Sequence, residues 1–260
     1  MTAIAHVDST ESGASLQTTS VLKALHLLEV FRNGADRLGV SEIARRAGIP
    51  TSTAYRLLAH LVEARFVVKE GTLYRPGGRL FELGDRVADS SLEVLREKAS
   101  PYLGDLYMRF GFTTRLGVLD GTDVIIVDKI VGLHSLPAPT PVGGRVAATC
   151  TALGKVLLAW QSGAVVAETL SSPLQRMTRH SVSNANVLHG QLLEARKTGL
   201  AYDREESGLG RVCVAAPIVS GRKVVAAISV SAPSHRAQLD KPARALLEAA
   251  ARIGADLGRD

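Results

Sequence analysis

Apolar positions with helical spacing mark the first part of the chain. Apolar residues at i, i+4, i+7 and i+10 predict a helix over residues 21–32. Ser41 is a favourable N-cap for a second helix, and Gly48 is a favourable end for it. Pro50 then opens a third helix, where its missing N–H is not needed. The pattern therefore predicts three short helices in succession.

Two short apolar segments follow the third helix. Residues 66–69 and 72–75 flank Gly71, which suits the tight turn of a β-hairpin. Beyond the hairpin, apolar spacing predicts one helix over residues 80–98, which we expect to connect two domains. Pro101 is expected to open a separate helix after it.

The remainder of the chain alternates between two periodicities. Strands are predicted at 113–119, 124–130, 212–219 and 223–231, helices at 151–160, 165–170, 187–197 and 242–257, and a loop at 133–147. Each pair of strands is joined by a short turn, which favours antiparallel pairing. We therefore expect an α+β fold with an antiparallel sheet rather than a doubly wound parallel one.

Composition supports a folded chain with a core. Of 260 residues, 46% are hydrophobic and 22% are charged. Residues 1–18 are small and polar and are expected to form a disordered tail. The expected domains are a module of three helices and a hairpin at 19–79, a linker helix at 80–98 and a larger domain at 99–260. The start of the chain shows no secretion signal, and no apolar run is long enough for a bilayer, so we expect a cytoplasmic protein without membrane contact.

Positive charge is concentrated in the first module. The net charge is +6, and residues 19–80 hold ten Lys and Arg against five Asp and Glu. Two helices, a glycine turn and a following hairpin have the form of a winged helix-turn-helix, whose second helix enters the DNA major groove. The alternative is a three-helix subdomain with a solvated basic face. The predicted DNA-binding residues are Ser41, Arg45, Arg46, Thr51, Ser52, Thr53, Tyr55, Arg56, His60, Lys69 and Arg75.

The larger module carries no complete catalytic motif. Gly154 and Lys155 suggest a phosphate loop, but Thr149 and Val156 stand where that motif needs Gly and Ser or Thr. Cys213 lies in an apolar strand, where a buried structural thiol is the first interpretation and a ligand contact the second. The histidines and cysteines lack metal-ligand spacing, so neither a metal nor a cofactor is expected.

An acidic cluster at Asp203, Glu205 and Glu206 is open to two interpretations. Close carboxylates could perform acid–base chemistry or hold a metal. They could also belong to a loop that caps a helix or pairs with Arg204 and Arg211, which we favour. An enzyme acting on a small carboxylate through this cluster or Cys213, with a basic accessory domain, is therefore the alternative to a DNA-binding regulator.

Four motifs in this order resemble the IclR family of bacterial transcriptional regulators. They are the helix-turn-helix segment 40–58, the sequence TALGK at 151–155, the signature spanning 199–217, and the strand ISVSAP at 228–233. The resemblance covers about residues 19–257. It implies a regulator rather than an enzyme, acting as a dimer or tetramer on a double-stranded DNA operator.

The same resemblance implies where an effector binds. It predicts a GAF-like α/β domain that senses small organic acids or aromatic compounds. Carried onto this chain, the effector-binding residues are Thr151, Ala152, Leu153, Gly154, Asp203, Cys213, Ser229 and Ser231. Backbone N–H groups at a helix start could receive a carboxylate, and alternate residues of a strand share one face, so this set is chemically coherent.

Overall fold

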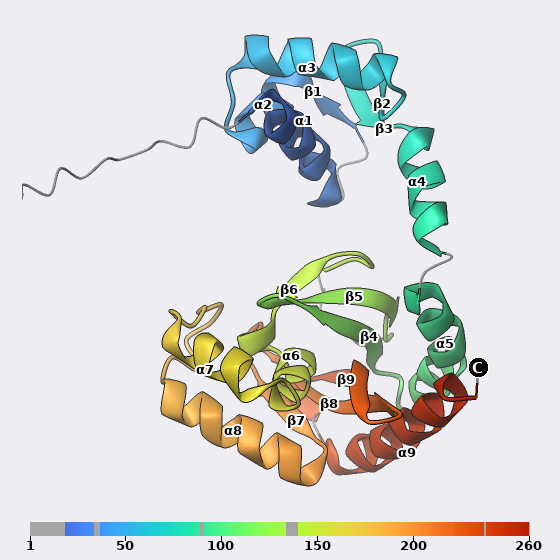
Figure 1. Cartoon of the computed structure of the whole chain (residues 1–260), viewed down its shortest axis with the longest axis vertical. Helices are drawn as coiled ribbons and strands as arrows, with labels where there is room; N and C mark the ends of the chain where they lie inside the picture. The colour runs from blue at the N-terminus through green and yellow to red at the C-terminus, as the bar shows by residue number, and fades with distance from the viewer. Residues whose placement is uncertain (1–18, 34–36, 89–90, 134–139, 237, 260) are drawn as a thin grey trace, which may run out of the picture. The chain divides into compact units, whose positions relative to one another are not determined.

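A computed structural model describes residues 19–33, 37–88, 91–133, 140–236 and 238–259 (Figure 1). The expected tail at 1–18 lies outside these residues. The chain divides into two compact units, Met1–Arg86 and Val87–Asp260. The fold is α+β, and each unit has its own hydrophobic core.

The N-terminal unit packs three helices against a small antiparallel sheet of order β1-β3-β2. Its elements are α1 (Ser20–Glu29), η1 (Val30–Asn33), β1 (Leu38–Gly39), α2 (Val40–Ala47), α3 (Thr51–Glu63), β2 (Val67–Glu70) and β3 (Leu73–Pro76). The predicted hairpin is confirmed, whereas β1 was not predicted because two residues carry no periodicity. Leu27, Ile43 and Leu58 are fully buried at the centre of this unit.

Helix α2 agrees with the sequence prediction at its C-terminal end and differs from it at its N-terminal end. Gly48 takes a left-handed φ of 66° and its N–H bonds to Ala44 O and Arg45 O, which ends α2 as predicted. The prediction of Ser41 as N-cap is wrong. The N-cap is Gly39, and Ser41 lies within the first turn with an exposed side chain.

The connection between the units differs from the predicted single linker helix. Two helices are present, α4 (Gly78–Ala88) and α5 (Ser91–Phe110), and Pro101 lies inside α5. Pro101 removes one helical hydrogen bond, but Leu95, Leu103 and Leu106 of α5 are buried in the core on either side of it. Tertiary packing therefore keeps the helix continuous where local propensity favours a break.

The C-terminal unit is built on a six-stranded antiparallel sheet of order β6-β5-β4-β9-β8-β7. The strands are β4 (Thr113–Asp120), β5 (Asp123–Ile130), β6 (Arg145–Ala147), β7 (Ala201–Arg204), β8 (Arg211–Ser220) and β9 (Lys223–Pro233). The four long strands match the predictions. Edge strand β6 lies within the segment predicted as a loop, and edge strand β7 was not predicted.

Helices cover both faces of this sheet. One face packs against α5 and α9 (Asp240–Leu257), and the other carries η2 (Ala148–Cys150), α6 (Ala152–Ala159), α7 (Gly163–Ser171) and α8 (Ala185–Thr198) (Figure 1). A short η3 (Ser234–Arg236) precedes α9. Among the described helices, none is both long and apolar enough to cross a membrane.

Strand alternation sorts the side chains of the central strands between these two faces. Val214 and Val230 belong to the core beneath α5 and α9. Cys213, Ser229 and Ser231 alternate with them, so they lie on the α6 side. The central strands therefore contribute polar side chains to the face where α6 begins.

Candidate functional site

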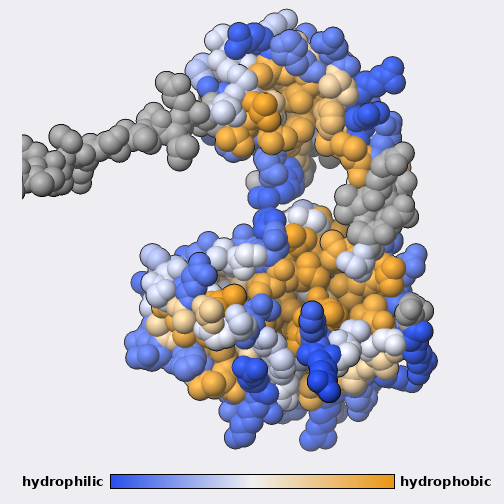
Figure 2. Space-filling model, in the orientation of Figure 1, coloured by the Kyte–Doolittle hydropathy of each residue, from blue (hydrophilic) through white to orange (hydrophobic). Residues whose placement is uncertain are grey.

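Helix α3 presents a row of polar side chains away from the core of the N-terminal unit. Ala54, Leu57 and Leu58 are buried, whereas the other predicted groups on this helix are exposed or half-buried: Thr51, Ser52, Thr53, Tyr55, Arg56 and His60. The surface along α3 is mainly hydrophilic (Figure 2). This exposure is what a helix that enters a DNA groove requires.

Two of the predicted DNA-binding arginines, Arg45 and Arg46, are paired within the protein. Arg45 Nη2 and Arg46 Nε donate to Glu42 Oε1 at 2.7 and 2.6 Å. Their hydrogen bonds lower the pKa of the Glu42 carboxyl to about 2, so Glu42 is ionised at neutral pH. Both cations must release or share Glu42 to contact a phosphate.

The hairpin carries two further predicted cations, Lys69 and Arg75. Arg75 Nε donates to Glu70 Oε1 at 2.6 Å. Lys69 Nζ lies 5.6 Å from the ring centroid of Tyr55 and 5.8 Å from that of Tyr74. Because Tyr55 belongs to α3, this cation–π contact joins the hairpin to the helix. Arg56 has no such contact among the described residues, which leaves its guanidinium available.

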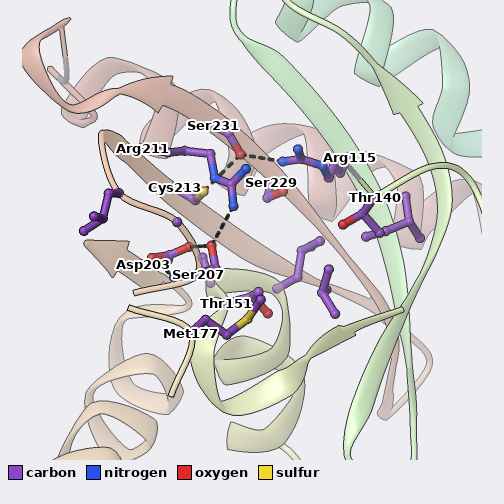
Figure 3. Close-up of a pocket in the computed structure, with 16 residues that line it drawn as sticks. Arg115, Thr140, Thr151, Met177, Asp203, Ser207, Arg211, Cys213, Ser229 and Ser231 are labelled. Atoms are coloured by element: carbon purple, nitrogen blue, oxygen red, sulfur yellow. Dashed lines mark hydrogen bonds between the residues drawn. The ribbon is translucent and has the colours of Figure 1, made fainter. Parts of the chain in front are cut away.

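A pocket of about 250 Å³ opens in the C-terminal unit between the sheet and α6 (Figure 3). It is lined by Arg115, Ile126, Thr140, Val146, Thr151, Ala152, Leu153, Met177, Asp203, Ser207, Gly208, Leu209, Arg211, Cys213, Ser229 and Ser231. Apolar walls with a few polar groups are typical of small-molecule sites, and this volume suits a small ligand.

Seven of the eight predicted effector residues line this pocket, and Gly154 does not. A Cβ at Gly154 would lie 2.1 Å from Ala148 O, so this glycine permits close packing of α6 on η2. Its N–H donates to Thr151 Oγ1 at 3.1 Å. The Gly154 N–H, one of the backbone donors expected to receive a carboxylate at the start of α6, is therefore already hydrogen-bonded. Ala152 and Leu153 line the pocket.

The polar groups of the sheet lie in adjacent rows across the strands. Asp203, Cys213 and Ser231 are successive partners across β7, β8 and β9, and Ser229 pairs with Arg115 of β4. Cys213 Sγ and Ser231 Oγ are 3.0 Å apart. Burial raises the pKa of the Cys213 thiol to about 12, so it is neutral and unsuited to nucleophilic attack.

The acidic cluster separates into structural roles. Asp203 Oδ1 accepts the Glu206 N–H at 2.7 Å, and its other oxygen accepts from Ser207. Both Glu206 carboxylate oxygens lie 2.5 Å from Lys155 Nζ. The favoured loop interpretation identified the wrong partner, because Glu206 pairs with the buried Lys155 and not with the neighbouring arginines. Within the described ranges, no three His, Cys, Asp or Glu side chains form a metal-binding group.

Sequence reasoning missed two pocket arginines, Arg115 and Arg211. Arg115 is buried and donates to Ser231, and Arg211 donates to Ser207 (Figure 3). The available signal for Arg115 was a charged residue within an otherwise apolar strand. Strand alternation places its side chain on the same face of β4 as Gly117.

A winged helix-turn-helix unit and a pocket-bearing α+β unit in one chain define a class of protein, the ligand-responsive DNA-binding regulators. The chain matches the IclR helix-turn-helix domain over residues 20–71 and the bacterial transcriptional regulator IclR C-terminal domain over residues 90–257. It therefore belongs to the IclR family of transcriptional regulators.

Curated relatives agree with this assignment. The chain is 34% identical over 221 residues to the HTH-type transcriptional regulator XynR of Escherichia coli, covering 84% of this chain and 87% of XynR. It is 32% identical over 238 residues to the transcriptional repressor IclR of the same organism, covering 88% and 85%. These relatives support a regulator over the alternative of an enzyme.

Solved structures extend the likeness to three dimensions. An IclR homolog from Microbacterium hydrocarbonoxydans complexed with 4-hydroxybenzoate has a TM-score of 0.84 and 27% identity, covering 93% of this chain and all of that chain. The IclR protein of Thermotoga maritima has a TM-score of 0.75 and 31% identity, covering 92% and 98%.

Proposed function

We propose that α3 contacts the bases of an operator while the hairpin contacts phosphates. The supporting observation is the exposed polar face of α3, on which Arg56 is available to grip a guanine. Thr51, Ser52 and Thr53 at the start of α3 complete the contact, and Tyr55 positions Lys69. Arg45, Arg46 and Arg75 contact phosphates once they release Glu42 and Glu70, and Ser41 and His60 contribute at the edges.

The chain acts on its operator as a dimer or tetramer in the cytoplasm, where its DNA is. A single winged helix covers one half-site, and a two-fold protein matches a palindromic operator. Residues 19–79 bind the DNA, α4 connects them to the C-terminal unit, and the C-terminal unit, which includes α5, binds the effector and assembles the oligomer. A change of operator binding on ligand addition is the regulatory event.

The effector is a small organic acid or aromatic compound bound in the pocket beneath α6. One observation carries this proposal: Thr151, Cys213 and Ser231, predicted from separate motifs, line one pocket of about 250 Å³. The 4-hydroxybenzoate held by the Microbacterium homolog supports the ligand class.

Selection of bound duplexes from a random DNA library tests the proposal. The wild-type chain should enrich a palindromic sequence and bind it with a steep salt dependence, because phosphate contacts release counterions. A small acid or aromatic compound should then change the operator affinity. A chain that enriches no sequence, or whose operator affinity is unchanged by every ligand tested, would overturn the proposed function.

A further inference from the structure

Two arginines reach the same pocket without an acidic partner. Arg115 on β4 is only 8% exposed, and its Nη1 donates to Ser231 Oγ at 2.7 Å. Arg211 at the start of β8 donates from Nη2 to Ser207 Oγ at 3.0 Å. Among the residues that the structure describes, neither guanidinium has a carboxylate within ion-pair distance. Both side chains approach the serine and cysteine end of the pocket (Figure 3).

This arrangement is costly for a protein without ligand. Burial lowers the pKa of the Arg115 guanidinium and the positive charge of Arg211 acts in the same direction, whereas the negative charge of Asp203 opposes this shift without forming an ion pair with Arg115. Arg211 Nε is buried and has no acceptor within the described part of the chain. Buried charges are normally paired and buried donors are normally satisfied, so the two arginines together indicate a missing anion.

Neighbouring groups do not supply that anion. The Cys213 thiol is neutral because burial raises its pKa to about 12. Asp203 is the acidic residue of the pocket lining, and it accepts hydrogen bonds from Glu206 N and from Ser207. Among the residues that line the pocket, two positive charges and one negative charge leave a single positive charge, which one negative charge on a ligand balances. Lys129, the partner of Arg115 across β4 and β5, lies outside this lining.

One part of the pocket wall is apolar. Ile126, Val146 and Leu153 line it, and Thr151 already occupies the Gly154 N–H at the helix start. We propose that the effector is a monoanionic acid whose carboxylate lies between Arg115 and Arg211, with its apolar body against this wall. The inference rests on the proposed function and moves anion recognition from the start of α6 to the two arginines.

Matched acids and amides test the charge requirement. Benzoate, 4-hydroxybenzoate and hexanoate are compared with their neutral amides and with the dianion phthalate, by thermal shift and by calorimetric titration of the full chain. At least one acid should raise Tm while its amide does not. An amide that binds as tightly as its acid, a preference for phthalate, or failure of every acid would overturn the inference.

Substitutions locate the anion. Arg115→Gln and Arg211→Gln should each weaken binding of the acid about 10-fold or more, as expected when a charge-assisted hydrogen bond is lost. Arg115→Lys should restore little, because an ammonium lacks the bidentate fork. Arg222→Gln, on the exposed β8–β9 turn, is the matched control and should bind normally. Normal binding by either pocket variant would place the carboxylate elsewhere.

A measurement without ligand keeps the inference independent of the probe. Arg115→Met removes a buried charge that has no counter-ion, so the ligand-free variant should melt at a higher temperature than wild type. A lower Tm would make Arg115 a structural residue and overturn the inference. A neutral compound that alters operator binding would also overturn it and leave the proposed function intact. Absence of operator binding would contradict only the proposed function.

Discussion

The buried ion pair between Lys155 and Glu206 allows a quantitative prediction. Lys155 is 1% exposed, and its Nζ donates to both oxygens of Glu206 at 2.5 Å and to Tyr202 O at 3.1 Å. Lys155→Met fills similar volume but leaves the Glu206 carboxylate buried without its cation. Breaking one side of a buried pair costs about 3–5 kcal/mol. For a domain of this size that lowers Tm by roughly 6–20 °C.

The penalty should depend on pH in a definite direction. Burial raises the pKa of the Glu206 carboxyl, and Lys155 is the main group that opposes this rise. Without Lys155 the folded-state pKa rises further above the unfolded value. Such a carboxyl contributes stability while it is protonated and loses it as pH rises through the folded pKa. Lys155→Met should therefore be more destabilised at pH 7.5 than at pH 5.

Thermal melts of five proteins at these two pH values supply the measurement. They are wild type, Lys155→Met, Glu206→Gln and the double variant, with exposed Lys223→Met as a control expected near wild type. The double variant should recover much of the stability lost by Lys155→Met, because no uncompensated charge remains. A Lys155→Met protein as stable as wild type, or with a penalty that grows at pH 5, would refute the argument.

Four further outcomes are expected. Arg56→Ala should lower operator preference by about 1–3 kcal/mol in a gel-shift assay if it grips a guanine, and unchanged binding would exclude that contact. Glu42→Gln should tighten binding to all duplexes by freeing two arginines, and weaker binding would show that the ion pairs position them. Gly154→Ala should destabilise the C-terminal unit in urea, because its methyl group meets Ala148 O; a neutral effect would contradict that packing. Cys213 should resist iodoacetamide at pH 8 in the folded chain, since its thiol is buried with a pKa of about 12, and rapid alkylation would contradict this.

Local patterns in the sequence were sufficient for most elements. Gly48 marks the end of α2 because a left-handed C-cap favours glycine wherever it occurs. The long strands of the C-terminal unit were predicted because apolar runs between short turns have few alternative structures. The motifs and their order were also sufficient to indicate the IclR family, since each motif is a continuous stretch of sequence.

Other features depend on contacts between distant segments. Pro101 lies inside α5 because leucines on both sides of it are buried against the sheet, which no local pattern shows. Lys155 and Glu206 lie 51 positions apart, and only the fold pairs them. The same holds for Arg115, which stands in an apolar strand and meets Ser231 across 116 positions. The sequence by itself determined the longer strands, most of the helices and the family, because propensity and motifs act over a few residues. The partner of each buried charge was decided by tertiary structure, because strand register and helix packing bring those groups together.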